Sequence, residues 1–461
     1  MTNRPSQSIR LLHALRAMTA VAGLSIRAAI RSRGVTALLV VLAAGVIGIP
    51  LLVSGDGTPA SEMQVRLRYT LVFSVSILGL ATLWGSCAAF GVEIDSRRME
   101  LTAVKPVHPL TLWFGRWFGL LLLDAVLLLG VVIGVRLQLT HLSGGAAEFA
   151  HLLVSRSVSR PLLPAPEDEA REKFVELQRD NRLPKDLSST EVFRQLVLES
   201  RNRYLVLQPG EHVSWKFHLT HPLAADGKLA IRIRFDTEAE SLADVHGICR
   251  LRRPGETTWS AEVPINDLVR NELELAVCAP QLAGARELEL EFDDQAAAKT
   301  AALLIQPRRA LALLTPQGTF TGNLVRVMLA QLAILAALAA LGLTLGACFS
   351  FPVAAFTATA LLLTVLVSAG NTPDLLQDAF PNETKPNLLE RISFAVTRGM
   401  DTMTQPLLQP EPLSQAVAGE HVPGAELWRV LFWGGLAYPL GLALIASRVL
   451  RRREMDKQGT N

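Results

Sequence analysis

Residues 324–370 read LVRVMLAQLAILAALAALGLTLGACFSFPVAAFTATALLLTVLVSAG, with Arg326 as the single charged residue. A membrane-crossing helix needs about 20 mainly apolar residues, so this block is too long for one crossing. Pro352 has no backbone N–H, and it disfavours helical geometry in the residue before it. The pattern therefore predicts two crossings within 323–370, separated at about 348–351.

Four further apolar stretches predict membrane-crossing helices, at residues 35–53, 69–92, 117–135 and 427–447. Half of the 461 residues are hydrophobic and 19% are charged, whereas soluble domains carry about 25% charged residues. This composition is not that of an ordinary soluble enzyme. The sequence predicts a polytopic α-helical membrane protein with six transmembrane helices, three of them within 35–136 and the last within 427–461.

The positions of the arginines predict the orientation. The first 34 residues contain no acidic residue, and both ends of the chain are basic, a property that favours the cytoplasmic side. Six crossings also place the two ends on one side. We therefore expect a multi-pass protein of a bacterial inner (cytoplasmic) membrane with both termini cytoplasmic. The basic residues concerned are Arg4, Arg10, Arg16, Arg27, Arg31, Arg33, Arg448, Arg451, Arg452, Arg453 and Lys457.

The N-terminal segment, 1–34, has helical periodicity. Residues 8–33 space apolar side chains at helical intervals with arginines between them, which predicts an amphipathic helix along the inner membrane interface. The alternative is a cytosolic helix with a solvated basic face. Gly34 is expected to end this helix.

Residues 137–322 have the composition of a water-soluble insert, which this topology places outside the cytoplasm. The part at 165–203 has a helical pattern, and the part at 204–320 alternates apolar and polar residues, as in RELELEFDD. Such alternation predicts an antiparallel β-sandwich, and thus an α+β domain. A second outer segment, 371–426, contains an amphipathic helical stretch, LLERISFAVTRGMDTM.

Two groups of side chains in the insert have competing interpretations. Glu287, Glu289 and Glu291 alternate with apolar residues, and we interpret them as the solvated face of a strand rather than an acidic metal ladder. Trp215 and Trp259 are expected in the sandwich core rather than stacked on a sugar or a lipid headgroup.

No motif predicts a catalytic, cofactor-binding or metal site in this chain. The four cysteines show no metal-ligand spacing, and Cys249 and Cys278 could form a disulfide if the insert faces an oxidising compartment. Phosphate-loop, hydrolase and zinc-protease motifs are missing from the sequence. The net charge of +3 without a basic cluster predicts no nucleic-acid partner. Asp124 is a candidate intramembrane polar site, facing either a transport pathway or a polar partner across a helix interface.

The loop at 93–116 is the most informative charged segment. Residues 93–119 read EIDSRRMELTAVKPVHPLTLWFGRWFG, and a short helix is expected until Pro106 and Pro109 end it. A short helix at the membrane surface suits docking into a groove on a cytosolic partner.

This loop, with the six spans and the interfacial helix, resembles that of the type-two ATP-binding cassette (ABC-2 type) permease subunits. The resemblance covers residues 1–136 and 323–453, and Arg116 replaces a lysine usual in the family. It implies that the loop is a coupling helix docking on a separate ATPase subunit, with roles for Glu93, Arg97, Arg98, Glu100 and Lys105. The loop pattern itself is matched at Glu93, Glu100, Leu101, Pro106, Val107, Gly115 and Arg116.

The implied function is that of a permease subunit, an exporter without enzymatic activity of its own. Its implied partners are an ABC ATPase subunit, a second permease copy or a related permease, and the lipid bilayer, with ATP and Mg held by the ATPase. The large insert after the third span departs from the family pattern, so the transported substrate is not predicted. The alternative is a membrane-anchored sensor or assembly scaffold whose outer β-domain binds a ligand or a protein.

Overall fold

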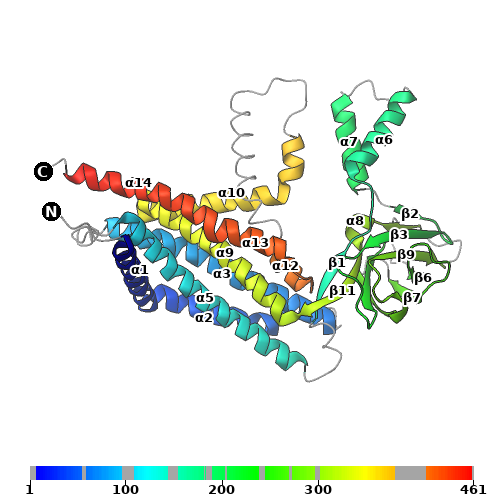
Figure 1. Ribbon diagram of the computed structural model, residues 1–461, viewed down its shortest axis with the longest axis horizontal. Coiled ribbons are helices and arrows are strands. Elements are labelled where there is room, and N and C mark those ends of the chain that lie inside the picture. The colour runs from blue at the N-terminus through cyan, green and yellow to red at the C-terminus, as the bar shows by residue number, and fades with distance from the viewer. Residues whose placement is uncertain are drawn as a thin grey trace. The chain divides into compact units, whose positions relative to one another are not determined.

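The structure is a computed structural model that divides into two compact units. A helical unit is built from both ends of the chain, and a β-rich unit is built mainly from Val154–Gly318. Both units are drawn in Figure 1. The residues described are 7–53, 59–95, 108–143, 154–180, 182, 189–202, 205–237, 244–268, 272–295, 302–378 and 412–458.

Among its described residues, the helical unit contains five helices that are long and apolar enough to cross a membrane, which indicates a membrane-embedded protein. They are α2, α3, α5, α9 and the continuous segment Gly424–Arg452. The helices of this unit are α1 (Gln7–Ile30), α2 (Arg33–Leu52), α3 (Pro59–Asp95), α5 (Pro109–Ser143), α9 (Phe320–Cys348), α10 (Phe351–Asp378), α12 (Pro412–Val417), α13 (Gly424–Phe432) and α14 (Tyr438–Gln458), with a π-helical turn at Trp433–Ala437.

The predicted break in the long apolar block is confirmed. Helix α9 ends at Cys348, Phe349 has an extended backbone, and α10 begins at Phe351. Pro352 therefore occupies the first turn of α10, where a missing N–H costs no helical hydrogen bond. The side chains of α10 are described as far as Leu366, and Phe351–Leu366 is apolar.

The helix expected at 8–33 is present as α1, but the prediction that Gly34 ends it is wrong. Helix α1 ends at Ile30, and α2 begins at Arg33, so Gly34 lies in the first turn of α2. The reason is Ser32, whose side-chain oxygen accepts a hydrogen bond from the backbone N–H of Val35 at 3.1 Å. Such an N-cap satisfies a donor at the helix start.

Helix α9 is the central helix of its unit. Of the residues in the apolar membrane-length segment of α9, 56% are buried, whereas 11% are buried in the corresponding segment of α2. Small residues let α9 approach α3 closely: a Cβ on Gly342 would lie 2.6 Å from the carbonyl oxygen of Leu83, and one on Gly346 would meet the backbone of Cys87. Close backbone approach at glycines is typical of packing between membrane helices.

In the part of the β-rich unit that the structure describes, the strands form two four-stranded sheets and one three-stranded sheet, in the orders β1-β11-β4-β8, β3-β9-β6-β7 and β2-β10-β5. Two helices, α6 (Pro166–Arg179) and α7 (Ser189–Asn202), fall within the predicted helical region and pack against each other. The strands are β1 (Val154–Ser159), β2 (Leu205–Leu207), β3 (His212–His218), β4 (Lys228–Arg234), β5 (Asp236–Thr237), β6 (Asp244–Arg252), β7 (Ala261–Leu268), β8 (Glu272–Cys278), β9 (Glu287–Asp294), β10 (Leu303–Ile305) and β11 (Leu311–Thr319), with a short helix α8 (Pro307–Ala310).

One hydrophobic core joins the two four-stranded sheets, as expected of a sandwich. Trp215 and Phe217 of β3 lie opposite Leu290 and Leu288 of β9, and all four are buried. Ile231 on β4 of the other sheet belongs to the same cluster. Strand β1 was not expected from the sequence, which showed no strand before the helical region.

Candidate functional site: the end of the helical bundle that carries the 93–116 loop

The structure describes the helices on either side of the predicted coupling loop. Gly115 and Arg116 lie in the first turns of α5, and the backbone of Glu93 belongs to the last turn of α3. The described part of this site is therefore the end of α3 and the beginning of α5. The remaining predicted residues, Arg97, Arg98, Glu100, Leu101, Lys105 and Pro106, lie outside the described residues.

Arg116 joins the two helices that flank the loop. Its guanidinium donates to the carbonyl oxygen of Ala89 and lies 4.1 Å from the ring centroid of Phe90, both on α3. A cation over an aromatic face is attracted by the ring quadrupole, more strongly where water is excluded. Since Arg116 is only 7% exposed, it positions the helices instead of offering a surface to a partner.

Helix α1 packs directly on the beginning of α5. A Cβ on Gly115 would lie 2.7 Å from Cβ of Val21 and 3.0 Å from the carbonyl oxygen of Met18, and one on Gly119 would lie 3.0 Å from the carbonyl oxygen of Ala22. Only glycine allows this approach of the two backbones. Helix α1 runs at a steep angle to the other helices of its unit (Figure 1), and it packs closely on the helix that follows the loop.

The last helix reaches the same end of the bundle. The guanidinium of Arg451, on α14, contacts the imidazole Nε2 of His108, the residue before α5. The other imidazole nitrogen, Nδ1, lies 3.2 Å from the backbone N–H of Leu110, in the first turn of α5. Four helices, α1, α3, α5 and α14, therefore meet where the loop leaves and re-enters the bundle.

Asp124 lies inside the bundle, between α5 and α3. It is 3% exposed, and its Oδ1 accepts a hydrogen bond of 2.8 Å from the hydroxyl of Thr82. Of the two environments considered for Asp124, the structure has the polar partner across a helix interface. Burying a carboxylate with few hydrogen bonds costs free energy, so the hydrogen bond from Thr82 offsets part of the cost of burying Asp124.

Thr82 belongs to a stripe of buried polar residues on α3. Thr70, Ser74, Thr82 and Ser86 are each at most 4% exposed and are separated by multiples of four residues. Residues four apart lie on the same face of a helix. Sequence reasoning missed Thr82 as the partner of Asp124, although this spacing was a signal that could have identified the face.

The acidic residues of β9 form ion pairs on the outer face of their sheet. Glu289 accepts from Arg252 on β6 at 2.8 Å, and Glu291 lies 3.4 Å from Arg250. The hydrogen bond from Arg252 lowers the pKa of Glu289, and the same contact raises the pKa of Arg252. The apolar side chains that alternate with the glutamates on β9 are buried. Glu287 is exposed, but Glu289 and Glu291 are largely covered by their arginine partners, so the predicted solvated face is solvated only in part.

The two tryptophans of this unit have different environments. Trp215 is 5% exposed and belongs to the core, as expected. Trp259 is half-buried, and Arg252 lies 4.2 Å above its ring centroid. Its expected place in the core is therefore wrong, because the cation–π contact holds it against the charged face.

The disulfide considered for Cys249 and Cys278 is not formed, because both residues have free thiols. Cys249 is buried on β6, and burial raises the pKa of its thiol to about 12. Cys278 is exposed at the end of β8, in the other four-stranded sheet, and its thiol lies 3.5 Å from the carbonyl oxygen of Asp226. The two cysteines therefore occupy separate and chemically different environments.

Comparisons of the chain with models of protein families, with curated proteins and with solved structures found no match. Among the described residues, no three or more His, Cys, Asp or Glu side chains are grouped so that they could hold a metal ion.

Proposed function

We propose that the chain is the membrane-spanning permease subunit of an ABC transporter. It would act as an exporter, coupling ATP hydrolysis by a separate nucleotide-binding subunit to the movement of a substrate across the membrane. ATP and Mg would be bound by that ATPase subunit, and a second permease copy or a related permease would complete the transport pathway.

The observation that carries this proposal is the packing of α1 on Gly115 and Gly119 at the beginning of α5. A coupling loop can act on the spans only if its ends are firmly attached to them. Here the helix after the loop is held by α1 on one side and by Arg116 on the other, where Arg116 reaches α3. A displacement of the loop would therefore move α1, α3 and α5 together.

The proposal includes a membrane placement. Helix α10 would be the sixth crossing, which brings both termini to the cytoplasmic face of a bacterial inner membrane and the β-rich unit to the outer side. The support for this orientation is the arginine content of both ends, including Arg451 and Arg452 near the end of α14. Basic residues near span ends favour the cytoplasm.

The energy for transport would come from the partner. Closure of two ATPase subunits around ATP would favour one arrangement of the loop at 93–116 over another, and a ligand shifts a conformational equilibrium only by its difference in affinity for the two states. In the loop, Arg97, Arg98 and Glu100 would supply charged contacts to the ATPase.

Charge reversal in the loop tests the proposal. Arg97→Glu/Arg98→Glu and Glu100→Ala are expected to lower the amount of ATPase that co-purifies with the intact protein in detergent, because docking loses its charged contacts. Membrane insertion, measured by the amount of protein in the membrane fraction, should not change. Mass spectrometry identifies the co-purified ATPase, and its activity is measured with and without the permease.

Arg452→Glu is the matched control, because it reverses an exposed charge near the end of α14, outside the loop. It should leave co-purification unchanged. If the loop variants retain the same ATPase with the same stimulation of activity, the coupling assignment is wrong.

A second candidate function is a membrane-anchored sensor or assembly scaffold. The observation that favours it is the β-rich unit, which has a hydrophobic core of its own and forms a separate compact body. In that case the β-rich unit would bind a ligand or protein, and the same purification would recover a kinase or a component of a secretion apparatus in place of an ATPase.

A further inference from the structure

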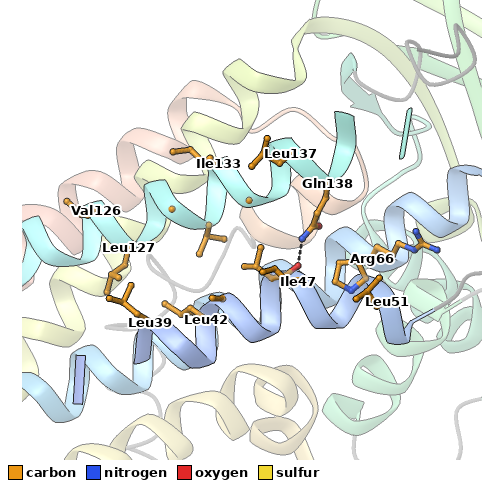
Figure 2. A pocket seen from close by; sticks show the side chains of 16 residues that line it. Leu39, Leu42, Ile47, Leu51, Arg66, Val126, Leu127, Ile133, Leu137 and Gln138 are labelled. Carbon is orange, nitrogen blue, oxygen red and sulfur yellow. Dashed lines mark hydrogen bonds between the residues drawn. The ribbon is translucent and has the colours of Figure 1, made fainter. Parts of the chain in front are cut away.

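A lateral groove of about 770 Å³ runs between α2 and α5. This volume lies within the range of about 300–1,000 Å³ that is typical of small-molecule sites. The lining runs from Leu39 to Leu51 on α2 and from Val126 to Gln138 on α5, with Arg66 contributed by α3 (Figure 2).

The groove exists because α2 and α5 touch at one level and separate at the next. A Cβ on Gly134 would lie 2.5 Å from Cγ1 of Val46, so the helices are in contact there, whereas a Cβ on Gly130 would meet nothing within 4 Å. Buried Leu42 and Leu127 are among its lining residues. Gly130 therefore leaves space that a larger side chain would fill.

The rim of the groove is apolar and exposed in the part of the chain that lies in the membrane. Leu39 and Ile47 on α2 and Ile133 on α5 are at least half exposed. Each lies in a helix that is long and apolar enough to cross a membrane. Their exposed surface therefore faces hydrocarbon.

One end of the groove is polar. Of the lining residues that the structure describes, Arg66 carries the only charge, and Gln138 donates to the carbonyl oxygen of Val46 (Figure 2). Helix α2 ends at Leu52, and the sequence that leads from it to Arg66, SGDGTPASEMQ at 54–64, is mainly polar, so this end of the groove coincides with a membrane boundary. Arginine at such a position extends its guanidinium toward the headgroups.

We propose that this groove binds an anionic phospholipid of the surrounding bilayer, with an acyl chain along the α2–α5 groove and the phosphate at Arg66. The twelve-residue rise from Leu39 to Leu51 corresponds to about 18 Å. One leaflet contributes about 15 Å of hydrocarbon, half of the roughly 30 Å core. The groove therefore has the length of one acyl chain, and its single cation lies at headgroup depth.

The charge selects the kind of lipid. A guanidinium forms charge-assisted, often bidentate hydrogen bonds with a phosphate, and an anionic lipid such as phosphatidylglycerol carries no ammonium group that would be repelled by Arg66. The apolar lining fits an acyl chain and offers no partners to water. The site needs only the membrane embedding of α2, α3 and α5, so it does not depend on an ATPase partner.

The test measures lipid binding to the intact, detergent-purified protein by native mass spectrometry. Phosphatidylglycerol and phosphatidylcholine with the same acyl chains are titrated separately. The wild-type protein is expected to bind phosphatidylglycerol about tenfold more tightly, because both lipids offer a phosphate to Arg66 but only phosphatidylcholine also brings a positive charge close to the guanidinium. Arg66→Gln should remove this preference, and Gly130→Leu should weaken binding of both lipids by filling the groove.

Two control variants match these substitutions. Arg68→Gln removes an exposed arginine two residues from Arg66, and Gly85→Leu adds a side chain at an exposed helical glycine with nothing within 4 Å. Neither residue lines the groove, and both variants should bind lipid like the wild type.

Three results would overturn the proposal. The first is undiminished lipid binding by Gly130→Leu, and the second is an unchanged preference for phosphatidylglycerol in Arg66→Gln. The third is a wild-type dimer that Gly130→Leu converts to a monomer without loss of lipid, since the groove would then be an interface between two copies. If Gly130→Leu does not fold, the comparison of the two lipids on the wild type and Arg66→Gln decides.

Discussion

The contact between α9 and α3 allows a prediction with a defined magnitude. Gly342→Ala would place a methyl group 2.6 Å from the carbonyl oxygen of Leu83 and against the hydroxyl of Ser86. The Leu83 contact is roughly 1 Å shorter than the ~3.5 Å at which non-bonded atoms attract. A side chain can rotate away, but Leu83 contributes backbone, so the two helices must separate.

Overpacking of this kind costs about 1–3 kcal/mol. A loss of 1 kcal/mol lowers the Tm of a domain of about 200 residues by about 2–4 °C, so we expect Gly342→Ala to lower Tm by roughly 2–12 °C. The assay is thermal unfolding of the detergent-purified protein, followed by size-exclusion chromatography of the fraction that stays folded.

Gly85→Ala is the control, because its methyl group would meet nothing within 4 Å. Alanine is favoured over glycine in helices by about 1 kcal/mol, so this variant should be as stable as the wild type or slightly more stable. The double variant Gly342→Ala/Ser86→Ala should recover only part of the loss, because the carbonyl oxygen of Leu83 remains. A Tm for Gly342→Ala equal to that of the wild type would refute the close approach of the two helices.

Three further predictions concern individual side chains. Asp124→Leu should destabilise the helical unit by about 1–3 kcal/mol in thermal unfolding, because it leaves the Thr82 hydroxyl buried without its acceptor; Asp124→Asn keeps the acceptor and should cost less. The lowered pKa of Glu289 means that its ion pair contributes stability above the unfolded pKa of about 4.3, and this contribution is lost as the pH falls through the lower folded pKa. Glu289→Gln should therefore show a smaller decrease than the wild type in urea midpoint between neutral and acid pH, and an equal decrease would contradict the pairing. Maleimide should label exposed Cys278 in the native protein but not buried Cys249, whose raised pKa keeps it a thiol, and equal labelling rates would show that the core is open.

Local chemistry explains which helix boundaries could be predicted. The break after Cys348 follows from Pro352 alone, because proline restricts the residue before it and suits a first helical turn. The boundary at Gly34 could not be predicted from glycine alone, since Ser32 competes with it by capping the next helix. Two signals within three residues thus had opposite consequences, and the cap prevailed.

Contacts between distant parts of the chain explain what was missed. The sequence of strand β1, VSRSVS, does not alternate regularly between apolar and polar residues. Its apolar residues are Val154 and Val158, and its buried positions hold serines and Arg156. This segment forms a strand because it pairs with β11 and because Arg156 forms an ion pair with Glu274. The partner of Asp124 is likewise 42 residues away on another helix, and a single sequence does not reveal such a pairing.

The neighbouring positions of β1 and β11 bear on how this chain could have arisen. β1 is the first strand of the β-rich unit, β11 is the last, and the two are hydrogen-bonded neighbours in one sheet. A domain whose first and last strands are adjacent can be inserted into a loop, or removed from it, with little change in the distance that the loop must bridge. The β-rich unit is therefore suited to gain or loss as a single genetic cassette between α5 and α9, so that the helical unit and the β-rich unit could have evolved under separate selection.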